Sequence, residues 1–281
     1  MTENLAIPKN TIEIIQKHNF VFRKQFGQNF LIDPRVLERI VESSGVGPED
    51  CVLEIGPGIG TMTRKLAEYA KKVIAVEIDD NLIPILQETL ADLPNVELIH
   101  NDIMKVDIRK LCEEQNEGKP IHVVANLPYY ITTPIIMGLF ESGVPLRNVT
   151  VMVQKEVADR LSAKVGSEDY SALSIEVQYL YDVKLEMNIS RFVFYPMPNV
   201  DSAVISFTPK RERDREFEEK FFELVKNCFR MRRKTLYNNL KDLYDAQKLE
   251  EVYVRTGLRR NIRAQQLTLD DFLKLNEVIA E

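Results

Sequence analysis

The chain has 281 residues, of which 44% are hydrophobic and 28% are charged, and its formal net charge at pH 7 is −6. This length predicts one large domain and a smaller one around a proper hydrophobic core, and the short apolar runs exclude a membrane-spanning chain. The N-terminus lacks a basic stretch followed by an apolar one, so no signal peptide is indicated. Three widely spaced cysteines, Cys51, Cys112 and Cys228, argue against a disulfide framework or a zinc site. We therefore expect a cytoplasmic protein without a bound metal.

The charge is unevenly distributed along the chain. From Pro209 to Glu281 there are 17 Lys and Arg residues against 14 Asp and Glu, whereas the preceding part has 20 against 29. Within this tail, five basic residues and no acid lie between Lys226 and Lys234, and a second basic cluster comprises Arg255, Arg259, Arg260 and Arg263. Such clusters are either solvated helix faces or phosphate-binding surfaces, so a nucleic-acid partner stays open despite the negative total.

The N-terminal region predicts a short helix over 11–18 and then an unusual segment over 20–31. That segment mixes aromatic side chains with polar ones, among them Gln28 and Asn29. It is too polar for a core strand and too aromatic for a plain linker, so we expect it to lie over another part of the protein. The Asp-Pro pair that follows predicts the start of a helix ending near Gly45.

A glycine-rich turn connects a predicted strand over 51–55 to a helix over 61–69. Glycines at positions 56, 58 and 60 allow positive φ and a close approach of a ligand to the backbone. The next strand, over 72–79, ends in acids, and Glu77 lies 21 residues beyond Gly56. At this separation a carboxylate reaches the ribose hydroxyls of a bound nucleoside. The pair therefore predicts a nucleoside cofactor.

Two nucleoside cofactors compete for this motif. The dinucleotide fingerprint is Gly-x-Gly-x-x-Gly, whereas the spacing here is Gly-x-Gly-x-Gly, with Thr61 in the last fingerprint position. Glu54, two residues before the first glycine, gives the Glu-x-Gly-x-Gly-x-Gly form that is familiar in S-adenosylmethionine methyltransferases. The loop therefore favours S-adenosylmethionine over a nicotinamide dinucleotide.

The third strand, over 96–102, ends at Asp102. This carboxylate could accept from the adenine amino group of the cofactor while the following apolar pair, Ile103 and Met104, flanks the ring. A helix-capping aspartate is the alternative. Residues 112–120 are polar and predict an exposed loop.

The sequence Asn-Leu-Pro-Tyr-Tyr at 126–130 directly follows a fourth strand over 121–125. Ligands of open α/β sheets bind at the carboxyl ends of the strands. Asn126 and the backbone carbonyl next to Pro128 offer two acceptors that would localise the lone pair of an exocyclic base amine, and Tyr129 would stack on the base. Taken alone, this stretch is equally consistent with an ordinary strand-to-helix turn.

The alternation continues and predicts the fold class. We expect further helices and strands over 132–140, 148–154, 156–163, 171–181, 183–189 and 203–207. This order predicts an α/β domain over 1–208, a Rossmann-like methyltransferase sheet with helices on both faces, in which 1–33 covers the cofactor. A stiff loop with two prolines would hold Phe194 over the second face of the base, or in the core. Residues 209–281 predict a small all-helical domain.

In this order, the stretches 28–31, 54–58, 126–129 and 194–200, together with Glu77 and Asp102, closely resemble the KsgA/RsmA family of small-subunit ribosomal RNA adenine dimethyltransferases. The resemblance covers nearly the whole chain. It implies N6,N6-dimethylation of two adjacent adenosines in the 3′-terminal hairpin loop of 16S rRNA, within the small ribosomal subunit or its precursor. It also implies S-adenosylmethionine as the cofactor and a role in subunit biogenesis. Nothing in the sequence suggests an obligate protein partner, so we expect a monomer.

The resemblance also implies roles for individual residues. Those implied to contact the cofactor are Gln28, Asn29, Leu31, Gly56, Gly58, Glu77, Ile78, Asp102, Ile103 and Asn126. Those implied to present and stack the target adenine are Asn126, Leu127, Pro128, Tyr129 and Phe194. Those implied to bind RNA are Arg230, Arg232, Arg233 and Lys234. The chain departs from the family pattern mildly, at Ala125 and Tyr130, and neither departure removes a proposed acceptor.

Two other functions remain compatible with the motifs. One is methylation of large-subunit RNA, which the complete helical tail disfavours. The other is a non-catalytic ribosome-assembly factor that uses the cofactor only as a checkpoint. If the chain is an enzyme, we expect direct in-line transfer without a covalent enzyme intermediate or a dedicated base, with the rate supplied by positioning and electrostatics.

Overall fold

The computed structural model describes residues 4–23, 26–210 and 212–281. Residues 1–3 and 24–25 of the expected cofactor-covering segment, and residue 211 of the expected tail, lie outside the described residues. The chain divides into two compact units, one of Met1–Ala158 with Lys184–Thr208 and one of Asp159–Val183 with Pro209–Glu281. One division coincides with the expected border at 209, whereas 159–183, expected in the first domain, fall in the second unit. The functional assignment of the two domains stays a prediction.

Seven strands form one sheet in the order β4-β3-β2-β5-β6-β9-β7. Their bounds are β2 (Cys51–Ile55), β3 (Lys72–Glu77), β4 (Val96–His100), β5 (Ile121–Asn126), β6 (Leu146–Gln154), β7 (Tyr181–Ile189) and β9 (Ser202–Pro209). The strands from β4 to β6 pair in parallel, and β9 runs antiparallel to β6. The central strands β2 and β5 are buried apolar runs, as strands covered on both faces must be. The predicted α/β fold is confirmed.

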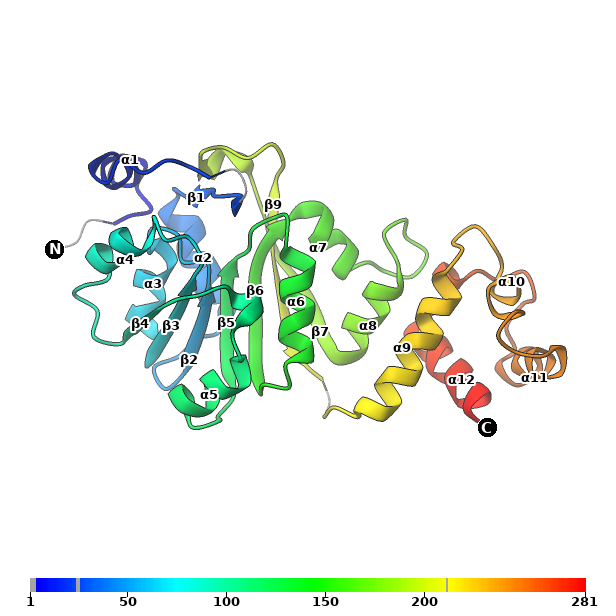
Figure 1. Ribbon diagram of the computed structural model, residues 1–281. Coiled ribbons are helices and arrows are strands. Elements are labelled where there is room, and N and C mark those ends of the chain that lie inside the picture. Colours follow the sequence, from blue (N-terminus) through cyan, green and yellow to red (C-terminus); the bar gives the residue numbers. More distant parts are fainter. Residues whose placement is uncertain (1–3, 24–25, 211) are drawn as a thin grey trace. The chain divides into compact units, whose positions relative to one another are not determined.

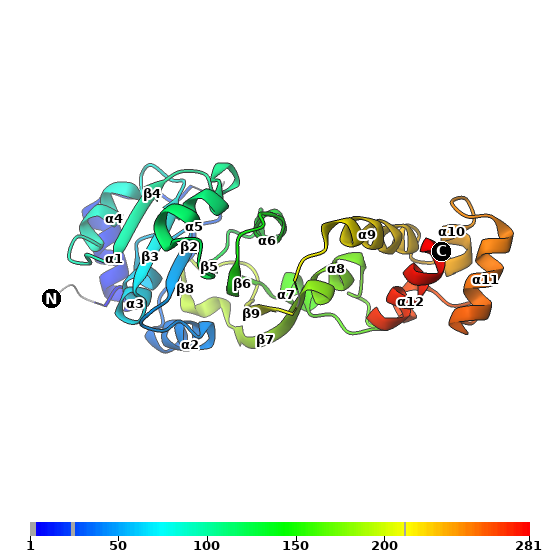
Figure 2. The ribbon, with the colours of Figure 1, turned by 90° about the horizontal axis from the view of Figure 1, so that it is seen from below.

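Helices cover both faces of this sheet. In Figure 1 and Figure 2, α2 (Pro34–Ser44) and α3 (Thr61–Tyr69) lie on one face, and α5 (Ile108–Asn116) and α6 (Thr132–Glu141) lie on the other. The first pair contributes Leu37, Ile40 and Leu66 to a buried cluster with Val52 of β2 and Val124 of β5. The helix α4 (Ile83–Thr89) contacts β4, and α7 (Lys155–Leu161) follows β6. These layers leave the carboxyl ends of the parallel strands for a ligand.

Helix α5 corrects one expectation. Residues 112–116, predicted to belong to an exposed loop, form the second half of this helix. Asp107 caps its first turn by accepting from the Lys110 N–H, and Leu111 and Cys112 are buried. The polar residues that suggested a loop occupy the solvent face of an amphipathic helix.

A second, two-stranded sheet joins segments that are far apart in the sequence. Strand β1 (Phe30–Leu31) pairs antiparallel with β8 (Phe194–Tyr195), and the Ile32 N–H extends the pairing to the Val193 carbonyl at 2.8 Å. Helix α1 (Pro8–Lys17) precedes this arrangement, and the short 3₁₀ helix η3 (Arg191–Val193) leads into β8. The sequence predicted an overlying segment and a stiff loop, but not that the two would pair.

The second unit is built from helices. They are α8 (Ala172–Leu180), α9 (Arg215–Phe229), α10 (Leu236–Leu240), α11 (Ala246–Thr256), the 3₁₀ helix η4 (Ala264–Gln266) and α12 (Leu269–Ala280). Phe221 and Cys228 of α9 and Phe272 of α12 form its buried core, and the rings of Phe229 and Phe272 stack at 5.7 Å. The tail is therefore helical as predicted. Among the described residues, no helix is both long and apolar enough to cross a membrane.

Candidate active site

A cavity lies in the first unit at the carboxyl ends of β2, β3 and β5. It is lined by the glycine-rich turn, the residues that end the three strands, and the N-terminal segment 26–31. Each of the ten residues expected to contact the cofactor lines this cavity, and so do Leu127, Pro128 and Tyr129. The structure thus brings together side chains predicted to share a site, while their individual roles stay predictions.

Glu77 ends β3 as a buried carboxyl surrounded by backbone donors. Its Oε1 accepts from the N–H groups of Ile78 and Asp79, both at 2.9 Å, and its Oε2 accepts from the Gly58 N–H at 3.3 Å. Burial nevertheless raises the pKa of Glu77 to about 7. The carboxyl is therefore held rigidly at the cavity wall, in a position suited to accept from ribose hydroxyls.

Glu54 lies deeper, in the middle of a buried strand. Its side chain is fully buried, and neither carboxyl oxygen has a hydrogen-bonded partner among the described residues. Burial raises the pKa of Glu54 to about 8; the nearby Thr63 hydroxyl acts against this shift, and the carboxyl of Glu77 adds to it. A buried acid without a partner is costly, so its presence on a cavity wall indicates a ligand that carries positive charge or donors.

These two carboxyls allow a test of the expected cofactor. S-adenosylmethionine carries an ammonium group, a sulfonium centre and a ribose diol. Its positive charge matches the buried carboxyl of Glu54, and its ribose hydroxyls match the carboxyl of Glu77 at the cavity wall. Gly58 has φ of +63°, and a Cβ there would lie 3.1 Å from the Phe30 ring, so a larger residue would be strained in this turn. The residues present therefore fit this cofactor.

Asp102 is a helix cap, as one interpretation of the sequence expected, and it also lines the cavity, while its role toward adenine stays a prediction. Its Oδ1 accepts from the Met104 N–H at 3.0 Å and so caps the 3₁₀ helix η2 (Ile103–Lys105). The same residue and Ile103 line the cavity. The second carboxylate oxygen, Oδ2, lies 4.0 Å from the Lys105 Nζ. Capping holds the carboxylate in place and does not use the oxygen that an adenine amino group would need.

The side chain of Asn126 is fixed by the N-terminal segment. Its Nδ2 donates to the backbone carbonyl of Asn29 at 3.1 Å. Because the amide is planar, this contact determines where Oδ1 points. No hydrogen bond to Oδ1 occurs among the described residues, and Asn126 lines the cavity. Oδ1 is thus available as an acceptor.

The backbone that follows identifies the second acceptor. The Pro128 carbonyl already accepts from the Thr132 Oγ1 at 2.9 Å and from the Ile131 N–H at 3.2 Å, at the start of α6. A carbonyl oxygen has two lone pairs, so this one is fully used. Of the carbonyls next to the proline, that of Leu127 therefore remains for a ligand, and the Leu127 N–H is anchored to the Met152 carbonyl at 3.0 Å.

Tyr129 is attached to the wall by its phenol. The hydroxyl lies 2.7 Å from the Oγ of Ser202, a fully buried residue at the start of β9. Burial raises the pKa of Tyr129 above its ordinary value, so the phenol stays neutral. The contact fixes one end of the ring, which lines the cavity and can stack on a flat ligand.

Phe194 is placed differently from the other target-binding candidates. It is 3% exposed, belongs to the buried cluster with Leu31 and Val204, and is absent from the described residues that line the cavity. Its backbone pairs with Leu31, and this pairing turns the ring into the core. Stacking of Phe194 on a base would require the ring to leave that cluster. This role stays a prediction, and the position of the ring in the structure does not support it.

The two basic clusters of the second unit differ in their partners. Arg230, Arg232, Arg233 and Lys234 are exposed in the turn between α9 and α10, and none pairs with a carboxylate among the described residues. Arg232 donates only to the backbone carbonyl of Glu168. In the second cluster, by contrast, two of the four arginines are paired: Arg255 with Glu251 and Glu281, and Arg260 with Glu250. The first cluster is therefore the better candidate for phosphate binding.

Several residues that line the cavity received no role from the sequence, among them Glu54 and Tyr130. Glu54 was noted as part of the glycine motif, and its position as an acid inside an apolar strand was the available signal. Tyr130 lines the cavity and is 58% exposed at its edge, where its ring approaches Gly27. Its neighbour Tyr129 gave the stronger signal, and no spacing in the sequence distinguished the second tyrosine.

The chain is similar to known proteins over most of its length. A family described as Ribosomal RNA adenine dimethylase matches residues 19–281. Ribosomal RNA small subunit methyltransferase A of Lachnoclostridium phytofermentans is 51% identical over 284 residues, covering 99% of this chain and 98% of that protein. The protein of the same name from Clostridioides difficile is 44% identical, covering 99% and 97%.

The chain is also similar to solved structures of rRNA methyltransferases and dimethyladenosine transferases. The 23S rRNA methyltransferase ErmE is 27% identical with a TM-score of 0.74, covering 90% of this chain and 100% of that one. A dimethyladenosine transferase from Plasmodium falciparum is 28% identical with a TM-score of 0.72, covering 88% and 95%. Both share the arrangement of sheet and helices described above.

Proposed function

The chain belongs to the ribosomal RNA adenine dimethylase family, and we propose that its substrate is the small ribosomal subunit or its precursor. It is an rRNA adenine dimethyltransferase. Its proposed targets are two adjacent adenosines in the 3′-terminal hairpin loop of 16S rRNA, each methylated twice at N6, as a step of subunit biogenesis. It is proposed to work as a cytoplasmic monomer.

S-adenosylmethionine, the proposed cofactor, supplies an electrophilic methyl group when bound. Glu77 would accept from its ribose hydroxyls, Asp102 from its adenine amino group, and Glu54 would compensate its positive charge. Gln28, Asn29, Leu31, Gly56, Gly58, Ile78 and Ile103 would form the rest of the binding surface. The fully buried carboxyl of Glu54 on the cavity wall supports this proposal.

The target amine would be held by Asn126 and Leu127. Asn126 Oδ1 and the Leu127 carbonyl would each accept one N–H of the amine and hold both out of the plane of the base, which localises the nitrogen lone pair. Pro128 restricts the backbone of Leu127, and Tyr129 would stack on the base. No side chain is needed as a dedicated base, because an amine that becomes cationic as it is methylated can lose its proton to water.

The single observation that carries this function is the state of Asn126. One end of its amide is tied to the Asn29 carbonyl, and the other faces a cavity that also contains Tyr129 and the cofactor candidates. A turn that served only to connect β5 to α6 would not need an oriented amide with a free acceptor.

The exposed arginines and lysine between α9 and α10 are proposed to bind the RNA backbone.

The function is tested with methyl-labelled S-adenosylmethionine and small ribosomal subunits from a strain without its own dimethylase. Large subunits are assayed in parallel, because of the structural similarity to ErmE. RNA is digested to nucleosides afterwards. We expect dimethyladenosine in small-subunit RNA only. Label in the large subunit would place the chain among large-subunit methyltransferases, and binding without label in either subunit would support an assembly factor.

A further inference from the structure

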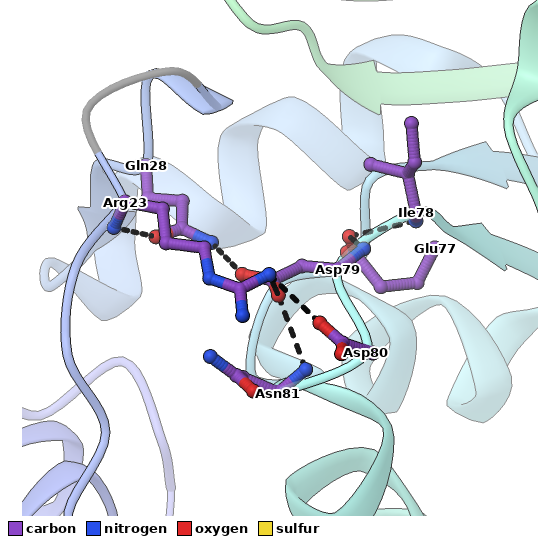
Figure 3. A network of polar contacts seen from close by, with 7 residues as sticks. All are labelled: Arg23, Gln28, Glu77, Ile78, Asp79, Asp80 and Asn81. Carbon is purple, nitrogen blue, oxygen red and sulfur yellow. Dashed lines mark hydrogen bonds and ion pairs between the residues drawn. The ribbon is translucent and has the colours of Figure 1, made fainter.

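The N-terminal strap, defined as residues 20–23 and 26–31, is attached to the loop after β3 by a polar network (Figure 3). Gln28 Nε2 donates to Asp79 Oδ2 at 2.6 Å, and Arg23 Nη1 donates to Asp79 Oδ1 at 2.9 Å and to Asp80 Oδ1 at 2.7 Å. The Arg23 N–H donates to Gln28 Oε1 at 2.9 Å, so the two strap residues also hold each other. Asp79 is fully buried, and its carboxylate is satisfied by these donors.

The same loop carries the proposed ribose-binding residue. The Asp79 N–H donates to Glu77 Oε1 at 2.9 Å (Figure 3), so the carboxylate that holds the strap and the carboxyl that faces the cofactor site belong to one rigid turn. The Phe30 ring of the strap packs on Gly58, whose N–H donates to the same Glu77. The strap therefore contacts the part of the cavity wall that is proposed to bind the cofactor, which includes Gly58 and Glu77.

The strap also contacts Asn126, which is proposed to hold the target adenine. The Asn29 carbonyl, one residue beyond Gln28, accepts from Asn126 Nδ2 at 3.1 Å. This contact distinguishes the two ends of the Asn126 amide. Without it, the amide can rotate by 180° and present its NH₂ group to a target amine, and two donors cannot bond to each other.

We propose that Arg23, Gln28 and Asp79 are positioning residues for the target adenine, acting through the Asn29 carbonyl on the amide of Asn126. This inference rests on the proposed methyl transfer and adds a role for residues that do not touch the target. Gln28 lines the cavity as part of the proposed cofactor surface, and the attachment of the strap to Asp79 is a second role that we assign to it. The proposal differs from a simple cofactor cover, because a cover affects the rate only by retaining the cofactor.

A matched set of variants tests the attachment. Gln28→Glu keeps the size of the side chain and places a second carboxylate against Asp79, so the strap should detach. Combining Gln28→Glu with Asp79→Asn restores the hydrogen bond with donor and acceptor exchanged. In that double variant, the amide oxygen at position 79 can still accept from Arg23. Lys17→Met is the control, because it removes the ion pair between Lys17 and Glu88 at 2.5 Å, an exposed contact of α1 outside the strap.

Three quantities are measured: cofactor affinity by calorimetry, amide hydrogen exchange of residues 30–32 in the ligand-free chain, and kcat at saturating cofactor. For Gln28→Glu we expect faster exchange and a kcat at least about ten-fold lower, the loss typical of a misplaced reacting group, with KM for the subunit little changed. The double variant should recover most of the exchange protection and most of the kcat. Lys17→Met should match the wild type in both quantities.

Two results would overturn the proposal. If saturating cofactor restores the kcat of Gln28→Glu, the strap only retains the cofactor. If the double variant recovers its exchange protection but not its kcat, the hydrogen bond does not act on Asn126. Each of these two results can be obtained only if the wild type is active. An inactive wild type would instead refute the proposed function, so the two failures are distinguishable.

Discussion

The cavity of the first unit and the α9–α10 turn of the second hold their charged and polar groups in opposite ways. In the cavity, Glu54 and Glu77 are buried, their pKa values are raised by burial, and Asn126 is fixed by a hydrogen bond. In the turn, Arg230, Arg233 and Lys234 are exposed, and no carboxylate among the described residues pairs with them. The polar groups of the cavity are buried or held by hydrogen bonds, whereas the charged groups of the turn are exposed to solvent.

This difference indicates what each region can do. Positioning a poor nucleophile needs acceptors at fixed places in a partly buried site, where each group has a large effect. Attraction of a polyanion needs charges that reach phosphates without first breaking internal ion pairs, and each such charge adds a modest, salt-dependent increment. Substitutions in the cavity should therefore change turnover, and substitutions in the turn should change binding.

The largest effect is expected for Asn126→Ala. Removing one of two acceptors aimed at the target amine should lower kcat by about 10²–10³-fold, the magnitude seen when one preorganised polar group is lost. Cofactor affinity, measured by titration calorimetry, should be largely retained. A variant that loses cofactor affinity as completely as activity would show that Asn126 belongs mainly to the cofactor site.

The next effect is expected for Arg232→Glu combined with Arg233→Glu. Subunit binding should weaken, and the slope of log affinity against log salt should fall by about 1 for each phosphate that is no longer neutralised. Affinity for the cofactor should not change, because the cavity belongs to the first unit. Filter binding over a salt series measures this. Unchanged affinity and slope would remove the proposed role of the turn.

A further effect concerns the pH dependence of cofactor binding. In the ligand-free protein the pKa values of Glu77 and Glu54 are raised to about 7 and about 8, so both carboxyls carry protons at pH 6. A cationic cofactor favours their ionised forms, so binding should release protons, and affinity should rise from pH 6 to 8 by up to about ten-fold per unit for each proton released. Calorimetry in buffers of different ionisation enthalpy counts these protons.

Glu77→Gln is the control for that measurement. It should weaken cofactor binding and reduce the number of protons released near pH 7, while the contribution of Glu54 persists. Cofactor affinity that does not depend on pH in the wild type would contradict the assignment of these carboxyls to the cofactor site.

The smallest effect is expected for Arg260→Gln in the second basic cluster. Its guanidinium already pairs with Glu250 and lies over the Tyr253 ring, so it has little charge to offer a phosphate. Subunit affinity should fall by about three-fold or less. This variant is the matched control for the double Arg→Glu variant, and an equal loss in both would show that ion pairing does not separate the two clusters.

Much of the cavity could be predicted from local signals. The glycine spacing, the carboxylate of Glu77 at the end of the next strand and the aromatic stretch at 126–130 each follow a buried strand, and parallel topology brings such ends together. Polar composition misled the prediction only where it covered the solvent face of a helix, as in α5.

The remaining features depend on contacts between distant segments. Strands of two residues, such as β1 and β8, carry no periodicity, so their pairing left no trace in the sequence pattern. The burial of Phe194 was one of the two placements predicted for it, and the sequence did not decide between them. The partner of Gln28 is Asp79, 51 positions away, and a glutamine that follows a single glycine gives no indication of which group it contacts. Such pairs require the three-dimensional structure.

The central claim is that the cavity supplies turnover and the α9–α10 turn supplies binding. Single-turnover methyl transfer, measured at saturating cofactor over a range of small-subunit concentrations, tests it most directly. The account predicts that high subunit concentration restores the rate of the Arg232→Glu/Arg233→Glu variant to near wild type, whereas the rate of Asn126→Ala stays low at every concentration. Recovery of Asn126→Ala, or a concentration-independent defect in the double variant, would contradict it.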